Sequence, residues 1–234
     1  MNTKESFAVF AIATTVVMSM ALFFLVEILS QGKNGSAASR QARNFVWKKS
    51  AGFLLLGIIP AVNAWFLFRE GPVQLGLVAG TSRIWLWFIP AALFFITLNA
   101  FNSRKEDLRR LYPEMRLMRW DARMLGLSAA GWFLYLFAYE YLFRGILLFG
   151  CYEAFGLWPA VTINLALYSA LHLPKGLKES AAAIPFGALI CWFTLDSGSI
   201  LPAVFLHFLQ AFSCEVWCII RNPEMKFEFK KIRS

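Results

Sequence analysis

Long apolar runs are the feature that most constrains how this chain of 234 residues can fold. Each run has about 18–25 residues, the length that a helix needs to cross the roughly 30 Å of bilayer hydrocarbon. Hydrophobic residues make up 59% of the sequence, whereas soluble domains are about 45–50% apolar even when Gly is counted. We therefore predict an all-α, polytopic helical integral membrane protein with about seven transmembrane helices, and not an outer-membrane barrel. The expected spans are residues 7–29, 51–68, 84–101, 125–150, 158–173, 179–195 and 198–220.

Lysine and arginine are distributed unevenly between the expected loops. The loops after spans one, three and five, together with the C-terminal tail, hold 19 of the 23 basic residues, while the N-terminus and the other loops hold 3. Basic loops stay in the cytosol. We therefore predict a multi-pass protein of the plasma or inner membrane, with its N-terminus outside and its C-terminus in the cytosol. The same distribution accounts for the net charge of +9, so we expect the lipid bilayer and no nucleic acid as a partner.

The loops divide the chain into regions of different character. Residues 32–50 are interpreted as a polar linker. Residues 102–124 carry Leu and Met at helical spacing, which predicts an amphipathic helix on the membrane surface, interrupted near Pro113; a solvated linker is the equal alternative. The predicted regions are N-terminal membrane segments with basic cytosolic loops at 1–124, a catalytic-type helical core at 125–220 and a basic tail at 221–234.

Two charged residues lie inside the fourth expected span. Glu140 and Arg144 are four residues apart, and on a helix this spacing puts them on one face within pairing distance. Charges at this depth cost several kcal/mol each unless they are paired or solvated, so they are rare and usually functional. His172 and His207, the two histidines of the sequence, lie in later apolar runs. We predict that these three segments converge on one polar pocket inside the membrane.

The residue types in this pocket favour hydrolysis of an amide. A carboxylate and an imidazole in a low-dielectric cavity can hold and deprotonate a water, and a second imidazole can donate a hydrogen bond to a developing oxyanion. Two alternatives stay open. The Glu140–Arg144 pair can be a structural clamp between helices. Two His and one Glu also form a zinc ligand set, but the sequence has no His-Glu-x-x-His and its histidines come from separate helices, so we expect no cofactor.

Three motifs occur in order between about residues 125 and 220. They are Glu140-x3-Arg144-Gly145, Tyr168-x3-His172, and Gly198-Ser199-Ile200-Leu201-Pro202 leading to His207. Their order and spacing resemble the CPBP family of CAAX prenyl proteases and bacteriocin-processing proteins, also called Abi. The resemblance implies a glutamic-type intramembrane endopeptidase that acts on a membrane-associated peptide or protein. It also implies that Glu140, His172 and His207 are catalytic and that Arg144 supports Glu140.

The sequence departs from the family pattern at two polar positions. The first motif of the family has two adjacent glutamates; Glu140 matches the second, and Tyr139 replaces the first, which is usually assigned to activating water. Ala211 replaces an Asn of the third motif, and Gln210 is the candidate to supply an amide in its place. Tyr168 replaces a Phe at the start of the second motif. These changes leave a second hypothesis, in which the chain is an inactive family member that acts as a membrane binding or scaffold protein.

The expected depths of two site residues do not agree. Glu140 lies about 15 residues, or about 22 Å, from the cytosolic end of its expected span. His172 lies only a few residues from that end of its own span. We therefore expect the fourth helix to begin later than residue 125, or the helices to tilt strongly, if the two side chains meet.

Overall fold

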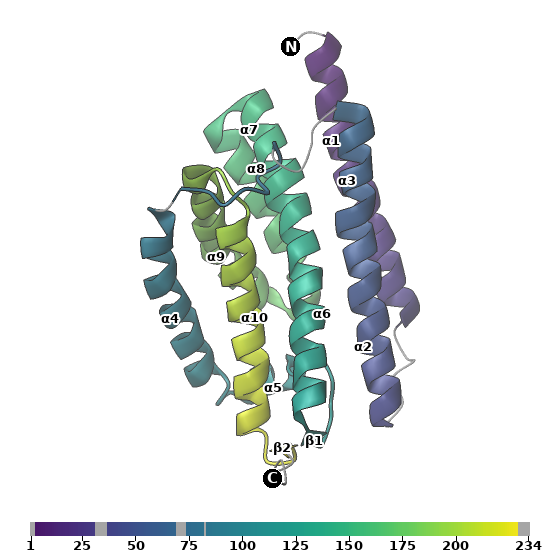
Figure 1. The fold of residues 1–234 in the computed structure, drawn as a ribbon, viewed down its shortest axis with the longest axis vertical. Coiled ribbons are helices and arrows are strands. Elements are labelled where there is room, and N and C mark those ends of the chain that lie inside the picture. The colour runs from purple at the N-terminus through teal and green to yellow at the C-terminus, as the bar shows by residue number, and fades with distance from the viewer. Residues whose placement is uncertain (1–2, 31–36, 69–73, 82, 229–234) are drawn as a thin grey trace.

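The computed structural model describes residues 3–30, 37–68, 74–81 and 83–228, and most of these residues are helical. Six helices among them are long and apolar enough to cross a membrane, which confirms an all-α polytopic membrane protein. The expected loop residues 31–36 and 69–73 and the tail residues 229–234 lie outside the described residues. The elements (Figure 1) are α1 (Thr3–Ser30), α2 (Ala38–Phe53), η1 (Leu54–Ile58), α3 (Ile59–Asn63), η2 (Ala64–Phe68), α4 (Ile84–Asn102), α5 (Glu106–Leu111), β1 (Arg119–Trp120), α6 (Ala122–Glu140), η3 (Tyr141–Leu148), α7 (Phe149–Phe155), α8 (Leu157–Ala170), η4 (Leu173–Lys175), α9 (Leu177–Ser197), α10 (Leu201–Arg221) and β2 (Lys226–Phe227).

The fifth expected span, 158–173, is the short helix α8. It has 14 residues, or about 21 Å, which is less than the hydrocarbon thickness of a bilayer. It follows α7 through a turn at Gly156, whose φ of +81° is an unstrained conformation for glycine. The helix ends before Pro174, which cannot continue a helix in register, and before Gly176 with φ +109°. Even so, α1 begins at one end of the molecule and α10 ends at the other, because α8 reverses the chain direction (Figure 1).

The prediction of a polar linker at 32–50 is wrong for its described second half. Helix α2 begins at Ala38 and runs without interruption into η1, α3 and η2. The buried side chains Ala42, Phe45 and Lys49 recur at helical spacing, so one face of this segment packs against α6. Burial of this face makes the segment a helical extension of the second span.

The prediction of an amphipathic helix at 102–124 is also wrong for most of its length. Only α5 is helical, and from Tyr112 to Trp120 the chain is largely extended. Burial here alternates with a period of two, since Met115 and Leu117 are buried while Met118 is 73% exposed. Strand β1 pairs in parallel with β2 of the C-terminal segment. This pairing provides hydrogen bonds for backbone N–H and C=O groups that a helix would have paired internally.

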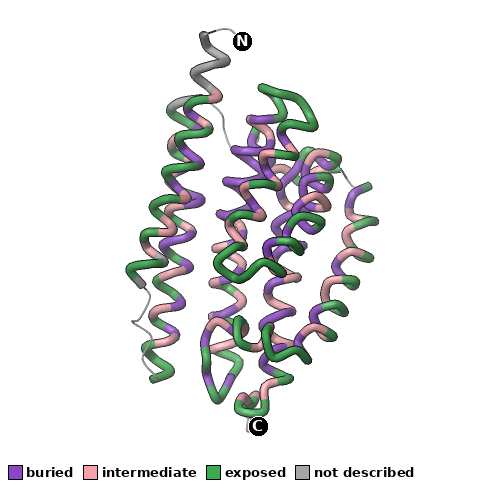
Figure 2. Tube along the Cα trace, turned by 180° about the vertical axis from the view of Figure 1, so that it is seen from behind, coloured by how far each residue is buried: buried purple, intermediate pink, exposed green. Residues whose placement is uncertain are grey.

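The buried core concentrates around η3, and all eight residues of this segment are buried (Figure 2). Helices α6, α8 and α9 surround it, together with α1 and η1. Gly145 lies in η3 where the backbone of Leu75 approaches, and a Cβ at this position would meet the Leu75 carbonyl oxygen at 3.0 Å. The residue after Arg144 therefore has to be small for residues 74–81 to pack over η3.

The Gly198-Ser199-Ile200 motif holds residues 74–81 against the start of α10. The Ser199 hydroxyl donates to the Val78 carbonyl at 2.5 Å, and the Ile200 amide donates to the Gly76 carbonyl at 2.9 Å. These bonds satisfy backbone groups that a loop inside a membrane protein has to pair. They fix the place where α10, the helix that carries His207, enters the bundle.

Candidate active site

Glu140 and Arg144 lie where α6 changes into the π-helix η3. Glu140 is the last residue of α6, and its Oε2 lies 3.2 Å from Nη1 of Arg144; neither side chain is exposed. The predicted pairing is therefore present. Short π-helical turns inside α-helices are frequently found at functional sites. Because neither Glu140 nor Arg144 is exposed, solvent hardly screens the attraction between their charges.

The second carboxylate oxygen of Glu140 binds His207 from α10. Its Oε1 lies 2.5 Å from Nδ1 of His207. A carboxylate only accepts hydrogen bonds, so Nδ1 donates and Nε2 of His207 points away from Glu140. The rings of Tyr139, Tyr168 and Phe186 surround the imidazole at centroid distances of 5.8, 6.0 and 5.4 Å. The carboxylate and the three rings thus enclose the imidazole and fix its orientation.

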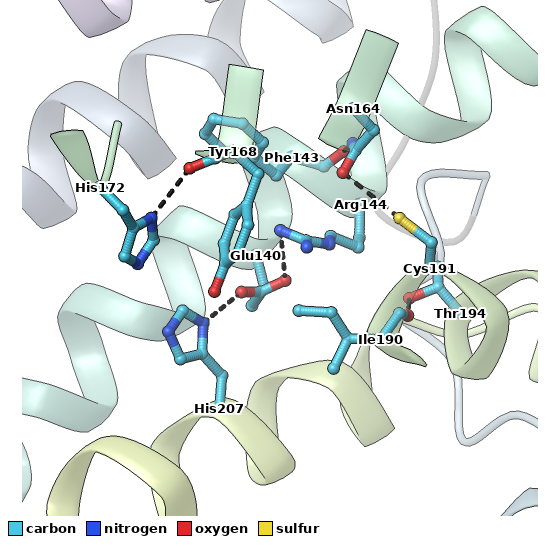
Figure 3. A network of polar contacts seen from close by, with 10 residues as sticks. All are labelled: Glu140, Phe143, Arg144, Asn164, Tyr168, His172, Ile190, Cys191, Thr194 and His207. Atoms are coloured by element: carbon cyan, nitrogen blue, oxygen red, sulfur yellow. Dashed lines mark hydrogen bonds and ion pairs between the residues drawn. The ribbon is translucent and has the colours of Figure 1, made fainter. Parts of the chain in front are cut away.

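His172 lies in the turn that follows α8 and is half-buried. Its Nδ1 donates to the Tyr168 carbonyl at 2.8 Å, so Nε2 of His172 is the nitrogen left for other partners. The Tyr168 ring lies between the parts of the site, 4.7 Å from the His172 ring and 4.6 Å from Cζ of Arg144 (Figure 3). Among the described residues His172 makes no hydrogen bond with Glu140, although the two are near enough to interact electrostatically. The three predicted segments do converge.

A later start of the fourth helix, one of the two expected ways for Glu140 and His172 to meet, is not observed. Helix α6 begins at Ala122, three residues earlier than expected rather than later. His172 is nevertheless deep enough to join the site because α8 is short and ends at Ala170. His172, at the start of the turn after α8, therefore lies beside Tyr168 with its ring 4.7 Å from the Tyr168 ring, whereas the residues that follow, 173–178, are exposed.

Tyr139 and Ala211, which depart from the family pattern, add no polar contact to the site. Tyr139 is buried and stacks on Phe143 at 4.6 Å, and its hydroxyl has no hydrogen-bond partner among the described residues. Ala211 is buried and has no polar side-chain atom. The backbone carbonyl of Gln210 accepts a bond from Asn99 of α4 at 2.7 Å, and no contact of the Gln210 side chain with the site is found in the described part of the chain.

Asn164 and Cys191, which were not predicted as site residues, are fully buried beside the ion pair. Asn164 Nδ2 donates to the Phe143 carbonyl at 2.7 Å, and Cys191 Sγ donates to Asn164 Oδ1 at 3.3 Å. One signal was available in the sequence. Asn164 precedes Tyr168 by four residues and His172 by eight, so all three lie on one face of a helix.

The described residues contain no group of three or more His, Cys, Asp or Glu side chains that could hold a metal ion. In the geometry of the site, both Nδ1 atoms of the histidines already have partners in Glu140 and the Tyr168 carbonyl.

Comparison with known proteins matches one part of the chain. Residues 121–213 match the family model described as type II CAAX prenyl endopeptidase Rce1-like. No curated protein and no solved structure matches the chain. The matched stretch runs from the residue before α6 into α10 and contains Glu140, Arg144, His172 and His207. Over residues 121–213 this membrane protein is therefore similar to the Rce1-like type II CAAX prenyl endopeptidases, and the match supports the fold of a CAAX-type intramembrane endopeptidase.

Proposed function

We propose that this protein is an intramembrane endopeptidase that hydrolyses a peptide bond near a prenylated end of a membrane-associated substrate. The observation that carries the proposal is the Glu140 carboxylate, which is fully buried and lies between Arg144 at 3.2 Å and His207 at 2.5 Å. A buried carboxylate and two imidazoles in one cluster are the groups that amide hydrolysis needs. The prenylated substrate comes from the description of the matching family.

In this proposal His172 is the general base. Its Nδ1 is bound to the Tyr168 carbonyl, so Nε2 is free to take a proton from water. The resulting hydroxide adds to the carbonyl carbon of the scissile amide and forms a tetrahedral intermediate. When the C–N bond breaks, His172 returns the proton to the leaving nitrogen.

His207 stabilises the oxyanion of the intermediate. Its Nδ1 donates to Glu140, so Nε2 is the nitrogen that faces the substrate, and as Nε2–H it donates to the oxyanion. Glu140 then acts through His207, and Arg144 holds Glu140 in place. The competing assignment, predicted from the sequence, is that Glu140 itself takes the proton from water. In that case Glu140 has to leave one of its two partners, Arg144 or His207.

The proposed site opens at the turn that carries His172. His172 is half-buried, whereas Leu173 and Leu177 beside it are 52% and 79% exposed. Glu140 and His207, in contrast, are enclosed. We therefore propose that water and the scissile bond reach His172 first, from the end of the molecule that the basic loops assign to the cytosol.

The alternative function is a non-catalytic binding or scaffold protein. The observation that favours it is the replacement of two polar family positions by Tyr139, whose buried hydroxyl is unpaired among the described residues, and by Ala211. Such a protein would hold a prenylated peptide against the same residues without cutting it.

The experiment that tests the proposal measures cleavage by the full chain purified in detergent. Its substrates are a prenylated peptide, the same peptide without the prenyl group and a mixed peptide library. The variants are His172→Gln, Glu140→Gln and Tyr139→Glu, each checked for folding by thermal unfolding. We expect the natural sequence to cut, and His172→Gln to lower kcat by about 10²–10⁴-fold, the contribution of a general base.

Glu140→Gln separates the two assignments of the carboxylate. If Glu140 acts through His207, the variant keeps residual cleavage well above that of His172→Gln. If Glu140 is itself the base, the two variants fall equally. Two results together would establish the scaffold function instead. Among the proteins tested, only Tyr139→Glu would cut, and the natural sequence would crosslink to a photoreactive prenylated peptide without cutting it.

A further inference from the structure

Asn164 is a buried amide in the middle of α8, a helix that is otherwise mostly apolar. Asn164 is 0% exposed. An amide in an apolar environment is costly unless its hydrogen bonds are made, so the position is unfavourable for packing alone. Asn164, Tyr168 and His172 follow one another at intervals of four residues. Figure 3 shows Asn164 and Tyr168 close to Arg144, with His172 beyond Tyr168.

The side chain of Asn164 joins three helices. Its Nδ2 donates to the Phe143 carbonyl of η3 at 2.7 Å, and its Oδ1 accepts from the Cys191 thiol of α9 at 3.3 Å (Figure 3). The two ends of the amide have opposite hydrogen-bonding character, so the carbonyl of Phe143 and the thiol of Cys191 together select one orientation of the amide. The amide is thus a fixed link and not an adaptable contact.

The link lies directly beside the catalytic charge pair. Phe143 precedes Arg144 in the widened turn of η3. The guanidinium of Arg144 makes the ion pair with Glu140 and lies over the Tyr168 ring, but its nitrogens make no hydrogen bond of good geometry to an oxygen of the described residues. Its position therefore depends strongly on the backbone that carries it.

We infer that Asn164 is a positioning residue of this site, which fixes the Phe143 carbonyl and thereby the place of Arg144, Glu140 and His207. The consequence for cleavage rests on the proposed function, whereas the consequence for the Glu140–His207 bond does not. A residue of this kind acts through geometry, since displacement of a reacting group by about 1 Å can cost about 10²-fold in rate.

The chain offers a matched control in Asn99. Asn99 is also buried, and its Nδ2 donates to the Gln210 carbonyl at 2.7 Å and to the Ser213 hydroxyl at 2.9 Å, which joins α4 to α10. Asn164→Leu and Asn99→Leu therefore each remove an amide that links helices, and only the first lies beside Arg144. We expect Asn164→Leu to lower kcat by about 10–100-fold with KM within about twofold, and Asn99→Leu to leave kcat unchanged.

A second readout does not need activity. Because the sequence has two histidines, the protein labelled with ¹⁵N-histidine gives two imidazole signal sets in NMR, which His172→Gln assigns. We expect the Nδ1–H signal of His207, bound to Glu140, to move in Asn164→Leu and to stay in place in Asn99→Leu. Asn164→Ala, which cannot overfill the site, replaces Asn164→Leu if that variant does not fold.

The outcomes separate the inference from the proposed function. A shift of the His207 signal only in the Asn164 variants supports the positioning role, even if the natural sequence cuts no substrate; in that case the proposed function alone fails. An unmoved His207 signal, with equal loss of thermal stability in the Asn164 and Asn99 variants, would overturn the inference and leave Asn164 as a link between helices.

Discussion

Two Glu–Arg pairs among the described residues have the same helical spacing and opposite surroundings. Glu140 and Arg144 are fully buried, whereas the side chains of Glu106 and Arg110 in α5 are 68% and 73% exposed. Water and salt screen the exposed pair. The buried pair has lost its hydration, so removing one partner leaves the other charged and uncompensated.

We predict that Arg144→Met lowers the free energy of unfolding by about 3–5 kcal/mol, measured by denaturant unfolding in micelles. The double variant Glu140→Gln/Arg144→Met should recover most of this stability without recovering the cleavage rate of the natural sequence. Arg110→Met is the matched control and should show no measurable loss. Equal stabilities of Arg144→Met and Arg110→Met would contradict the burial argument.

The phenol of Tyr139 is a second case in which burial decides the effect of a polar group. Its hydroxyl is buried and has no hydrogen-bond partner among the described residues, while its ring stacks on Phe143. We predict that Tyr139→Phe keeps the stack and raises the free energy of unfolding by about 1 kcal/mol, because an unmade buried hydrogen bond is removed. Cleavage should persist. A tenfold or greater loss of kcat in Tyr139→Phe would instead show that the hydroxyl contacts the reacting groups.

At the scale of elements, Lys49 of α2 joins α6 to the extended segment 112–120. Nζ of Lys49 lies 2.7 Å from Glu114 and 3.4 Å from the centre of the Trp132 ring. The extended segment is bound from the other side as well, since Glu215 of α10 accepts from the Glu114 amide at 2.8 Å and from the Ser128 hydroxyl. A segment outside the helices is thus held by buried polar contacts.

We predict that Lys49→Met lowers the free energy of unfolding by roughly 1–3 kcal/mol, from the loss of a charged hydrogen bond and a cation–π contact. It should also speed amide hydrogen exchange in residues 112–118. Arg43→Met, in the same helix at an exposed position, should change neither quantity. Unchanged exchange in Lys49→Met would mean that apolar burial of Met115 and Leu117 holds the segment without help from Lys49.

At the scale of the whole molecule, the two ends of the bundle differ in charge. The basic residues of the loops predict that the end with the extended segment faces the cytosol, and the α7–α8 turn lies at the opposite end (Figure 1). Met118 is 73% exposed at the first end, and Glu153 is exposed near the second. The four native cysteines are buried, so a thiol reagent should label an introduced, exposed cysteine selectively.

We predict that a membrane-impermeant maleimide labels Glu153→Cys in intact cells, and labels Met118→Cys only after the membrane is opened. The physical reason is the cost of moving many cationic loops across a bilayer. The natural sequence, with its buried cysteines, is the unlabelled control. The reverse labelling pattern would invert the orientation and would place the opening beside His172 outside the cell.

The sequence predicted the broad class of the fold and the convergence of the site for simple physical reasons. Apolar runs of membrane-spanning length have few alternatives to helices in lipid. Glu140, Arg144, His172 and His207 are conspicuous because ionisable groups are so rare in such runs. Spacing along one helix was also sufficient to predict that Glu140 and Arg144 pair, because this contact is local.

Contacts between segments far apart in the chain decided the rest. The helical part of 38–50 forms because α6 covers its apolar face, and the extended segment forms because β2 and Glu215 pair its backbone. The partner of Glu140 is His207 rather than His172, and Asn164 binds the Phe143 carbonyl. Apolar periodicity and rare charges are properties of short stretches, so the sequence by itself determined the membrane-spanning helices and which residues gather. Which atoms meet depends on the depth at which α8 ends and on the widened turn of η3, and both follow only from packing of the whole bundle.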